Sequence, residues 1–230
     1  MRLILTAHGS ADPRSAQTTH AVAEQIRALR PGLEVAVAFC EKSAPNLSDV
    51  LADRRAPGVV TPLLLASAYH ARVDIPAMIA EANADVVQAD SLGEDPRLIE
   101  VLRQRVIEAA PPARDTGVLV VAVGSSHAEA NARTATLADS LTGEWAAVRV
   151  AYATGPQPSV TDGLAQLRAA GAGQIIVAPW FIAPGRITDR VAATVTAEDA
   201  VMAEPLGAHP LLAATVLDRF DNAVAARLVA

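Results

Sequence analysis

Short apolar runs alternate with longer amphipathic segments along the first half of the chain. The apolar runs have the length and the Val, Ile, Leu and Ala content of buried strands; they cover residues 2–6, 33–39, 59–65 and 85–88. The segments between them carry helical spacing and helix start or stop signals; they cover residues 15–29, 46–54, 74 onward and 95–109. Asp74 is placed to cap the third helix, with Pro76 in its first turn. This order predicts an α/β fold with a parallel sheet.

The second half repeats the pattern. Strands are expected at residues 117–123, 146–152, 174–182 and 201–204, with helices between and after them. Three motifs recur in the same order and at nearly the same spacing: Gly9-Ser10 and Gly124-Ser125, Pro62 and Pro179, and SLGEDPRLIEVLRQR and PLGAHPLLAATVLDR. We therefore expect two similar α/β domains, residues 1–112 and 117–230, joined by a linker at 111–116 and facing each other across a cleft. The two prolines lie in apolar runs, which indicates a shared bulge or strand start.

Composition excludes several classes of function. The net charge is −6 and the isoelectric point is about 5.3, which disfavours a general nucleic-acid-binding protein. A single cysteine, Cys40, excludes an intrachain disulfide and a cysteine-ligated iron–sulfur cluster. No GxGxxG or GxxxxGK[ST] motif is present, so no nucleotide site is expected. Neither a signal peptide nor a membrane span is recognisable, so we expect a cytoplasmic protein without a membrane partner.

Two histidines stand where apolar runs end. His8 follows the first predicted strand and His70 follows the third. Ligands of open α/β sheets gather at the carboxyl ends of the strands. The second half has Val123 where the first has His8, so the fold does not require both histidines. Glu41 follows the second strand and adds a carboxylate. Such a set suits cobalt, iron, nickel or zinc, or could act as general bases; a structural role for the histidines and an exposed surface role for Glu41 remain open.

Basic side chains flank these positions. Arg14, Lys42 and Arg72 lie near the pair in sequence, and Arg186 and Arg190 lie at the matching place in the second half. Arginine suits carboxylate ligands, and Gly9-Ser10 opens a helix whose free N–H groups favour anions. The pattern indicates an anionic small molecule, although each arginine could also be a solvated surface residue.

These motifs together resemble one family. HGSADPRS after the first strand, a glutamate after the second, PLLLASAYHARVDIP after the third and PWFIAPGRITDRV in the second half are similar to class II tetrapyrrole chelatases. The resemblance is to the CbiX/SirB type, the sirohydrochlorin cobalto- and ferrochelatases, in a long two-domain form, and covers nearly the whole chain.

The resemblance implies a lyase that inserts Fe²⁺ or Co²⁺ into sirohydrochlorin, in siroheme or cobalamin biosynthesis, without ATP. It implies His8, Glu41 and His70 as metal ligands, with His8 and His70 also catalytic. The macrocycle would be an anionic partner, and its expected contacts are Ser10, Arg14, Ser43, Ser67, Ala68, Tyr69, Arg72 and Arg186. Because one chain supplies both domains, we expect a monomer. No iron–sulfur cluster is expected.

Two alternative functions also fit parts of the sequence. A non-catalytic metal or tetrapyrrole carrier could keep the same fold; it would not need a proton acceptor. A histidine-phosphatase-like fold also opens with a strand and His-Gly, but that family has Arg before the histidine and this chain has Ala7. The sequence does not decide the metal, because iron and cobalt use the same ligand types.

Overall fold

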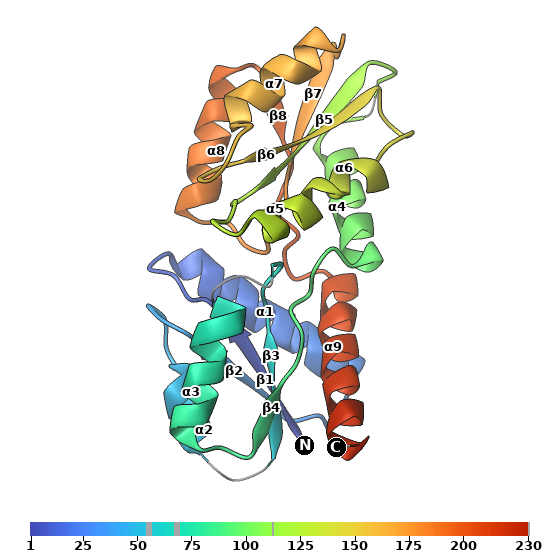
Figure 1. The fold of residues 1–230 in the computed structure, drawn as a ribbon. Helices are drawn as coiled ribbons and strands as arrows, with labels where there is room; N and C mark the ends of the chain where they lie inside the picture. Colours follow the sequence, from blue (N-terminus) through green and yellow to red (C-terminus); the bar gives the residue numbers. More distant parts are fainter. Residues whose placement is uncertain (54–56, 67–69, 112, 230) are drawn as a thin grey trace. The chain divides into compact units, whose positions relative to one another are not determined.

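The structure, a computed structural model, describes residues 1–53, 57–66, 70–111 and 113–229, with the backbone alone at His70. The chain forms two compact units (Figure 1). Unit 1 combines Met1–Asp95 with Ala208–Ala230, and unit 2 is the continuous segment Pro96–Gly207. Each unit holds a four-stranded parallel sheet flanked by helices, which confirms the predicted fold class. Within the described ranges, no helix is long and apolar enough to cross a lipid bilayer.

Unit 1 is built around the sheet order β2-β1-β3-β4. Its elements are β1 (Arg2–Ala7), α1 (Pro13–Leu29), β2 (Val35–Phe39), α2 (Leu47–Ala52), β3 (Gly58–Pro62), the π-helical turn η1 (His70–Asp74), α3 (Ile75–Ala82), β4 (Val86–Gln88) and α9 (Pro210–Val229). The register joins Ala7 of β1 to Phe39 of β2, and Thr6 to Pro62 of β3. The strand order reverses at β1, so ligands are expected at the carboxyl ends of β1 and its neighbours.

Unit 2 repeats this sheet in the order β6-β5-β7-β8. Its elements are α4 (Pro96–Ala109), β5 (Thr116–Ala122), α5 (Ala128–Ala135), α6 (Leu137–Ser140), β6 (Ala147–Tyr152), α7 (Val160–Ala169), β7 (Gln174–Pro179), α8 (Arg186–Ala197) and β8 (Val201–Met202). The register is the counterpart of that in unit 1, with Ala122 beside Tyr152 and Val121 beside Pro179. The sequence repeat is thus also a repeat of backbone structure.

Aliphatic side chains form a separate core in each unit. In unit 1, Ile4 and Val60 from the sheet pack with Leu47 and Leu51 of α2 and with Ile75 of α3. In unit 2 the corresponding cluster joins β5 and β7 to α7 and α8; it includes Leu119, Val121, Leu164, Leu167, Val177, Val191 and Val195. Burying each such side chain stabilises the fold by about 1.5–3 kcal/mol before the entropy cost of ordering it.

Each sequence repeat ends in a helix, and that helix packs in the compact unit whose strands come from the other repeat. Helix α4 follows β4 in the chain but contacts β7, and α9 follows β8 but contacts β3 and β4. The compact units therefore differ from the predicted domains 1–112 and 117–230. The chain passes between units at Asp95/Pro96 and at Gly207/Ala208, so residues 111–116 are a connection inside unit 2, not the predicted linker. The two helices have similar sequences, so the sequence alone does not assign either one to a sheet.

The repeated prolines end their strands. Pro62 is the last residue of β3 and Pro179 is the last of β7, so the predicted strand start or bulge is wrong. Proline lacks an N–H group and cannot donate to the next ladder bond. The next residues still donate to the neighbouring strand: Leu63 N–H to the Thr6 carbonyl, and Trp180 N–H to the Val121 carbonyl. The strands are shorter than the apolar runs that predicted them.

Asp74 does not cap its helix through its side chain. It occupies the N-cap position of α3 with φ −68° and ψ −51°, which are helical values, and makes no side-chain cap hydrogen bond. The cause is η1, which runs directly into α3. Pro76 lies in the first turn of α3, as predicted.

Candidate functional site

The site lies where β1, β2 and β3 end. His8 is the first residue after β1, and Glu41 follows β2 by two residues. Their backbones are joined, because Glu41 N–H donates to the carbonyl of His8 at 3.0 Å. The third predicted ligand, His70, begins η1, which follows β3 in the chain. Parallel strands bring His8 and Glu41 to one edge of the sheet.

The side chains of His8 and Glu41 face each other. Nε2 of His8 lies 3.5 Å from Oε1 of Glu41, and the side chains are 38% and 44% exposed. Nδ1 of His8 lies 2.8 Å from the carbonyl oxygen of Gly9. A carbonyl oxygen only accepts hydrogen bonds, so Nδ1 carries the proton. In the neutral ring, the lone pair is then on Nε2, on the side of the carboxylate.

This spacing suits a shared metal ion. Two ligand atoms on a tetrahedral ion, each about 2.1 Å from it, are about 3.4 Å apart. The separation of 3.5 Å between Nε2 and Oε1 matches that value. Within the part of the chain that the structure describes, no group of three His, Cys, Asp or Glu side chains is arranged to hold a metal. The side chain of His70 lies outside that part.

Gly9 allows the two loops to approach. Its φ is +90°, and a Cβ atom built there would lie 1.7 Å from the carbonyl oxygen of Glu41. Only glycine fits both the backbone conformation and the space. The loops are also joined by serines: Ser43 Oγ accepts from Ser10 N–H at 3.1 Å and donates to the Ser10 carbonyl at 2.9 Å. Ser43, predicted to bind substrate, thus has a structural bond to the opposite loop.

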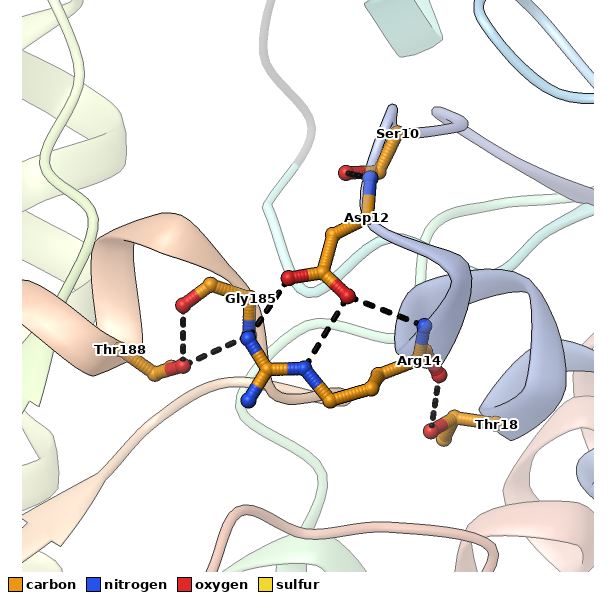
Figure 2. A network of polar contacts seen from close by, with 6 residues as sticks. All are labelled: Ser10, Asp12, Arg14, Thr18, Gly185 and Thr188. Atoms are coloured by element: carbon orange, nitrogen blue, oxygen red, sulfur yellow. Dashed lines mark hydrogen bonds and ion pairs between the residues drawn. The ribbon is translucent and has the colours of Figure 1, made fainter.

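Arg14 is held in an ion pair at the start of α1 (Figure 2). Asp12 is the N-cap of this helix and accepts from Arg14 N–H. The same carboxylate receives Nε and Nη2 of Arg14 at 3.0 and 2.6 Å. Ser10 Oγ accepts from Asp12 N–H at 3.0 Å. Figure 2 also draws the polar contacts of Gly185 and Thr188 at the start of α8. The guanidinium of Arg14 is therefore fixed in orientation by Asp12.

The remaining predicted substrate contacts include two exposed arginines. Arg72 is exposed on η1 in unit 1, and Arg186 is exposed at the first position of α8 in unit 2. Ser67, Ala68 and Tyr69 lie outside the described residues. Trp180 and Phe181, which directly follow β7, are buried core residues.

Two charged residues add to the site beyond the predicted ligands. Nζ of Lys42 lies 2.6 Å from Oε1 of Glu41, so this cation pairs with the candidate ligand. Burial, together with the smaller effect of the negative charges of Asp74 and Glu41, raises the pKa of the Cys40 thiol to about 11. Asp74, predicted only as a helix cap, therefore brings a second carboxylate near Cys40. Cys40 stays a neutral thiol near pH 7.

Unit 2 has the same pair of loops at the equivalent edge of its sheet, but without the histidine and the glutamate. Thr154 N–H donates to the carbonyl of Val123, the bond that Glu41 makes to His8 in unit 1. Gly124 has φ +90°, as Gly9 does. An open pocket of about 610 Å³ lies here, lined by backbone and small polar side chains that include Ser125, Asn131 and Thr154. The loops thus form with valine and threonine in the places of histidine and glutamate.

Known proteins match this chain in sequence. The CbiX family model matches residues 2–109 and 117–223. The sirohydrochlorin cobaltochelatase of Priestia megaterium is 25% identical, over 82% of this chain and 66% of its own length. The chain thus spans just under two thirds of that relative. The sirohydrochlorin ferrochelatase of the same organism is 26% identical, over 77% of this chain and 73% of its own length.

Solved structures match it in fold. SirB from Bacillus subtilis with Fe³⁺ superposes with a TM-score of 0.80 and 19% identity, covering 97% of this chain and 96% of that one. CbiX, described as the terminal enzyme for biosynthesis of siroheme in denitrifying bacteria, gives a TM-score of 0.74 and 21% identity, covering 97% and 99%. These likenesses establish the fold. With the family model matching both halves, the predicted resemblance is confirmed: the chain belongs to the CbiX family.

Proposed function

We propose that this chain is a sirohydrochlorin chelatase that inserts Fe²⁺ or Co²⁺ into the macrocycle without ATP. One observation carries the proposal. Both units build the same loop pair at the end of the sheet, but only unit 1 places an imidazole and a carboxylate 3.5 Å apart there. Because Val123 and Thr154 support the same loops, folding does not require His8 and Glu41.

The metal set in this proposal is His8, Glu41 and His70. Nε2 of His8 and Oε1 of Glu41 bind the incoming ion from adjacent loops, and His70 completes the set from η1. Because the set has only three protein ligands, the ion keeps open coordination positions. It can therefore pass to the four pyrrole nitrogens. Imidazole and carboxylate suit divalent iron and cobalt, and neither holds them as firmly as a cysteine-rich site would.

Metal insertion also releases two protons from the macrocycle. A histidine that is neutral near pH 7 can accept one of them. Once the ion has left Nε2 of His8, that lone pair is free while Nδ1 remains bonded to Gly9. His8 and His70 are accordingly proposed as proton acceptors as well as ligands.

The substrate carries several carboxylates, so cations at the edge have a role. We assign Arg14, already oriented by Asp12, and the exposed Arg72 and Arg186 to these carboxylates. Ser10, Ser43 and residues 67–69 are assigned to the macrocycle itself. The proposal also includes a cytoplasmic monomer that uses no nucleotide and no iron–sulfur cluster.

Absorbance during an anaerobic reaction tests the function. Purified protein is mixed with sirohydrochlorin and Co²⁺ or Fe²⁺, beside the variants His8→Ala, Glu41→Gln and His70→Ala. His127→Ala is a matched control, because His127 is exposed after the equivalent strand of unit 2. We expect protein-dependent formation of the metallated product, lost in the three site variants and kept in the control. If tetrapyrrole bound but insertion ran no faster than without protein, the alternative function as a carrier would be correct.

A further inference from the structure

One residue of the site has no role in the proposed function. Lys42 is the only lysine of the sequence, in which the other 18 of the 19 Lys and Arg residues are arginine. It follows Glu41 directly, and its Nζ lies 2.6 Å from the same Oε1 atom that faces His8. The one lysine of the chain therefore pairs with a candidate metal ligand.

The backbone holds Lys42 at this place at some cost. Ser43 N–H donates to the carbonyl of Glu41 at 2.7 Å, which closes a three-residue turn with Lys42 at its centre. The φ of Lys42 is +59°, a region that residues with a Cβ atom enter rarely. At the corresponding place in unit 2, Gly155 follows Thr154. Unit 2 thus lacks both the carboxylate and the ammonium.

Lysine differs from arginine in how it binds a carboxylate. A guanidinium binds with two parallel hydrogen bonds and a fixed geometry, whereas an ammonium is a compact, strongly hydrated point charge on a flexible stem. The Lys42 and Glu41 side chains are 56% and 44% exposed. Exposed ion pairs of this kind are weak and screened by salt, so a divalent ion can displace the ammonium.

We propose that Lys42 is a positioning residue that occupies the Glu41 carboxylate in the metal-free protein and exchanges with the metal ion. The entering ion takes Oε1 of Glu41 and repels the ammonium. When the ion leaves for the macrocycle, the ammonium returns and compensates the carboxylate. The exchange lowers metal affinity and favours release. The release step rests on the proposed function, whereas the displacement step concerns metal binding alone.

Titration with Co²⁺ in the absence of tetrapyrrole tests displacement. Lys42→Met and Lys42→Gly remove the ammonium, and the glycine variant also removes any backbone strain. We expect both to lower the Kd for Co²⁺ about two- to fivefold, with a difference that shrinks as NaCl is raised. Lys42→Arg keeps a competing cation and is expected not to lower the Kd. Arg133→Met, at an exposed site in unit 2, controls for the change in net charge. A Kd unchanged or raised in Lys42→Met and Lys42→Gly would overturn the proposal.

Acetylation by an N-hydroxysuccinimidyl ester gives an independent readout. Lys42 is the only side-chain amine, so mass spectrometry follows it directly, with the α-amino group of the chain as internal control. We expect Co²⁺ to speed acetylation of Lys42 and to leave the α-amino group unaffected. An equal rate for Lys42 with and without Co²⁺ would show that the ion does not displace it.

Steady-state insertion of Co²⁺ tests release. We expect Lys42→Met to lower both the KM for Co²⁺ and kcat. Lys42→Arg, which keeps a cation at this position, is expected to have a kcat closer to that of the wild type. A lower Kd with unchanged kcat would overturn the release step and leave displacement standing. If the wild-type protein inserted no metal, the proposed function would fail, while the titration and acetylation results would still decide displacement.

Discussion

Replacing Gly9 with alanine tests the close approach of the loops after β1 and β2. The φ of Gly9 is +90°, and a Cβ atom there would lie 1.7 Å from the Glu41 carbonyl oxygen. Gly32 and Gly124 share this backbone conformation but not this neighbour. Gly32 has φ +89° and no atom within 4 Å of the added Cβ, whereas at Gly124, with φ +90°, the nearest atom is Cα of Gly155 at 3.0 Å. The three positions separate the cost of the conformation from that of the clash.

Only the conformational cost applies at Gly32, and it is about 1–2 kcal/mol for alanine. At Gly9 the clash is with backbone, so the loop must move, which adds about 1–3 kcal/mol. We therefore expect Gly9→Ala to lower the free energy of unfolding by about 2–5 kcal/mol, with Gly124→Ala between the other two. Because the displaced loop carries Glu41, only Gly9→Ala is expected to weaken Co²⁺ binding.

Urea unfolding followed by far-ultraviolet circular dichroism measures the free energies, and titration of the folded proteins measures Co²⁺ affinity. Fluorescence of Trp145 and Trp180 reports on unit 2, which contains both tryptophans of the sequence. Equal destabilisation by Gly9→Ala and Gly32→Ala would refute the close contact between the loops. Wild-type Co²⁺ affinity in Gly9→Ala would refute its role in placing Glu41.

Three further predictions follow from burial, helix exchange and an ion pair. Burial raises the pKa of Cys40 to about 11, so its alkylation by iodoacetamide should accelerate about tenfold per pH unit from pH 8 to 10, without levelling off near pH 9. Phe220→Ala in α9, where the side chain is 5% exposed, should cost about 3–5 kcal/mol and unfold unit 1 before the tryptophan signal changes; Leu102→Ala in α4 should reverse this order. Arg30 lowers the pKa of Asp221, so the pair contributes stability above the unfolded pKa, and that contribution is lost as pH falls through the folded pKa. The difference in urea stability between wild type and Asp221→Asn should thus be about 1 kcal/mol or less at pH 7, and should vanish once the pH is below the lowered pKa of Asp221 in the folded protein.

The pattern of apolar and polar positions predicted the parts of the fold that depend on local sequence. Apolar runs gave the strands, and the end of each run placed His8 and Glu41 at one edge of the sheet, where the structure brings them to 3.5 Å. The assignment of His70 to the same ligand set remains a prediction, since its side chain is outside the described residues.

Other features depend on contacts that a pattern does not contain. Strand β3 ends at Pro62, whereas the apolar run continues past it. The ion pair of Lys42 with Glu41 depends on a turn in which Lys42 has a positive φ, and a lysine in the sequence does not indicate such a turn. Helices α4 and α9 have apolar stripes of the same spacing, so only the tertiary structure shows which sheet each one covers.

The exchange of these helices has a consequence for synthesis on the ribosome. Domains usually fold in the order in which they emerge. Here unit 2 is one continuous segment, Pro96–Gly207, and can be complete while translation continues. Unit 1 emerges first but lacks α9, which covers β3 and β4, until residues 210–229 have left the exit tunnel. The half that carries His8 and Glu41 is therefore the last to be finished, and the nascent chain holds its metal-ligating residues on an incomplete sheet until the final helix docks.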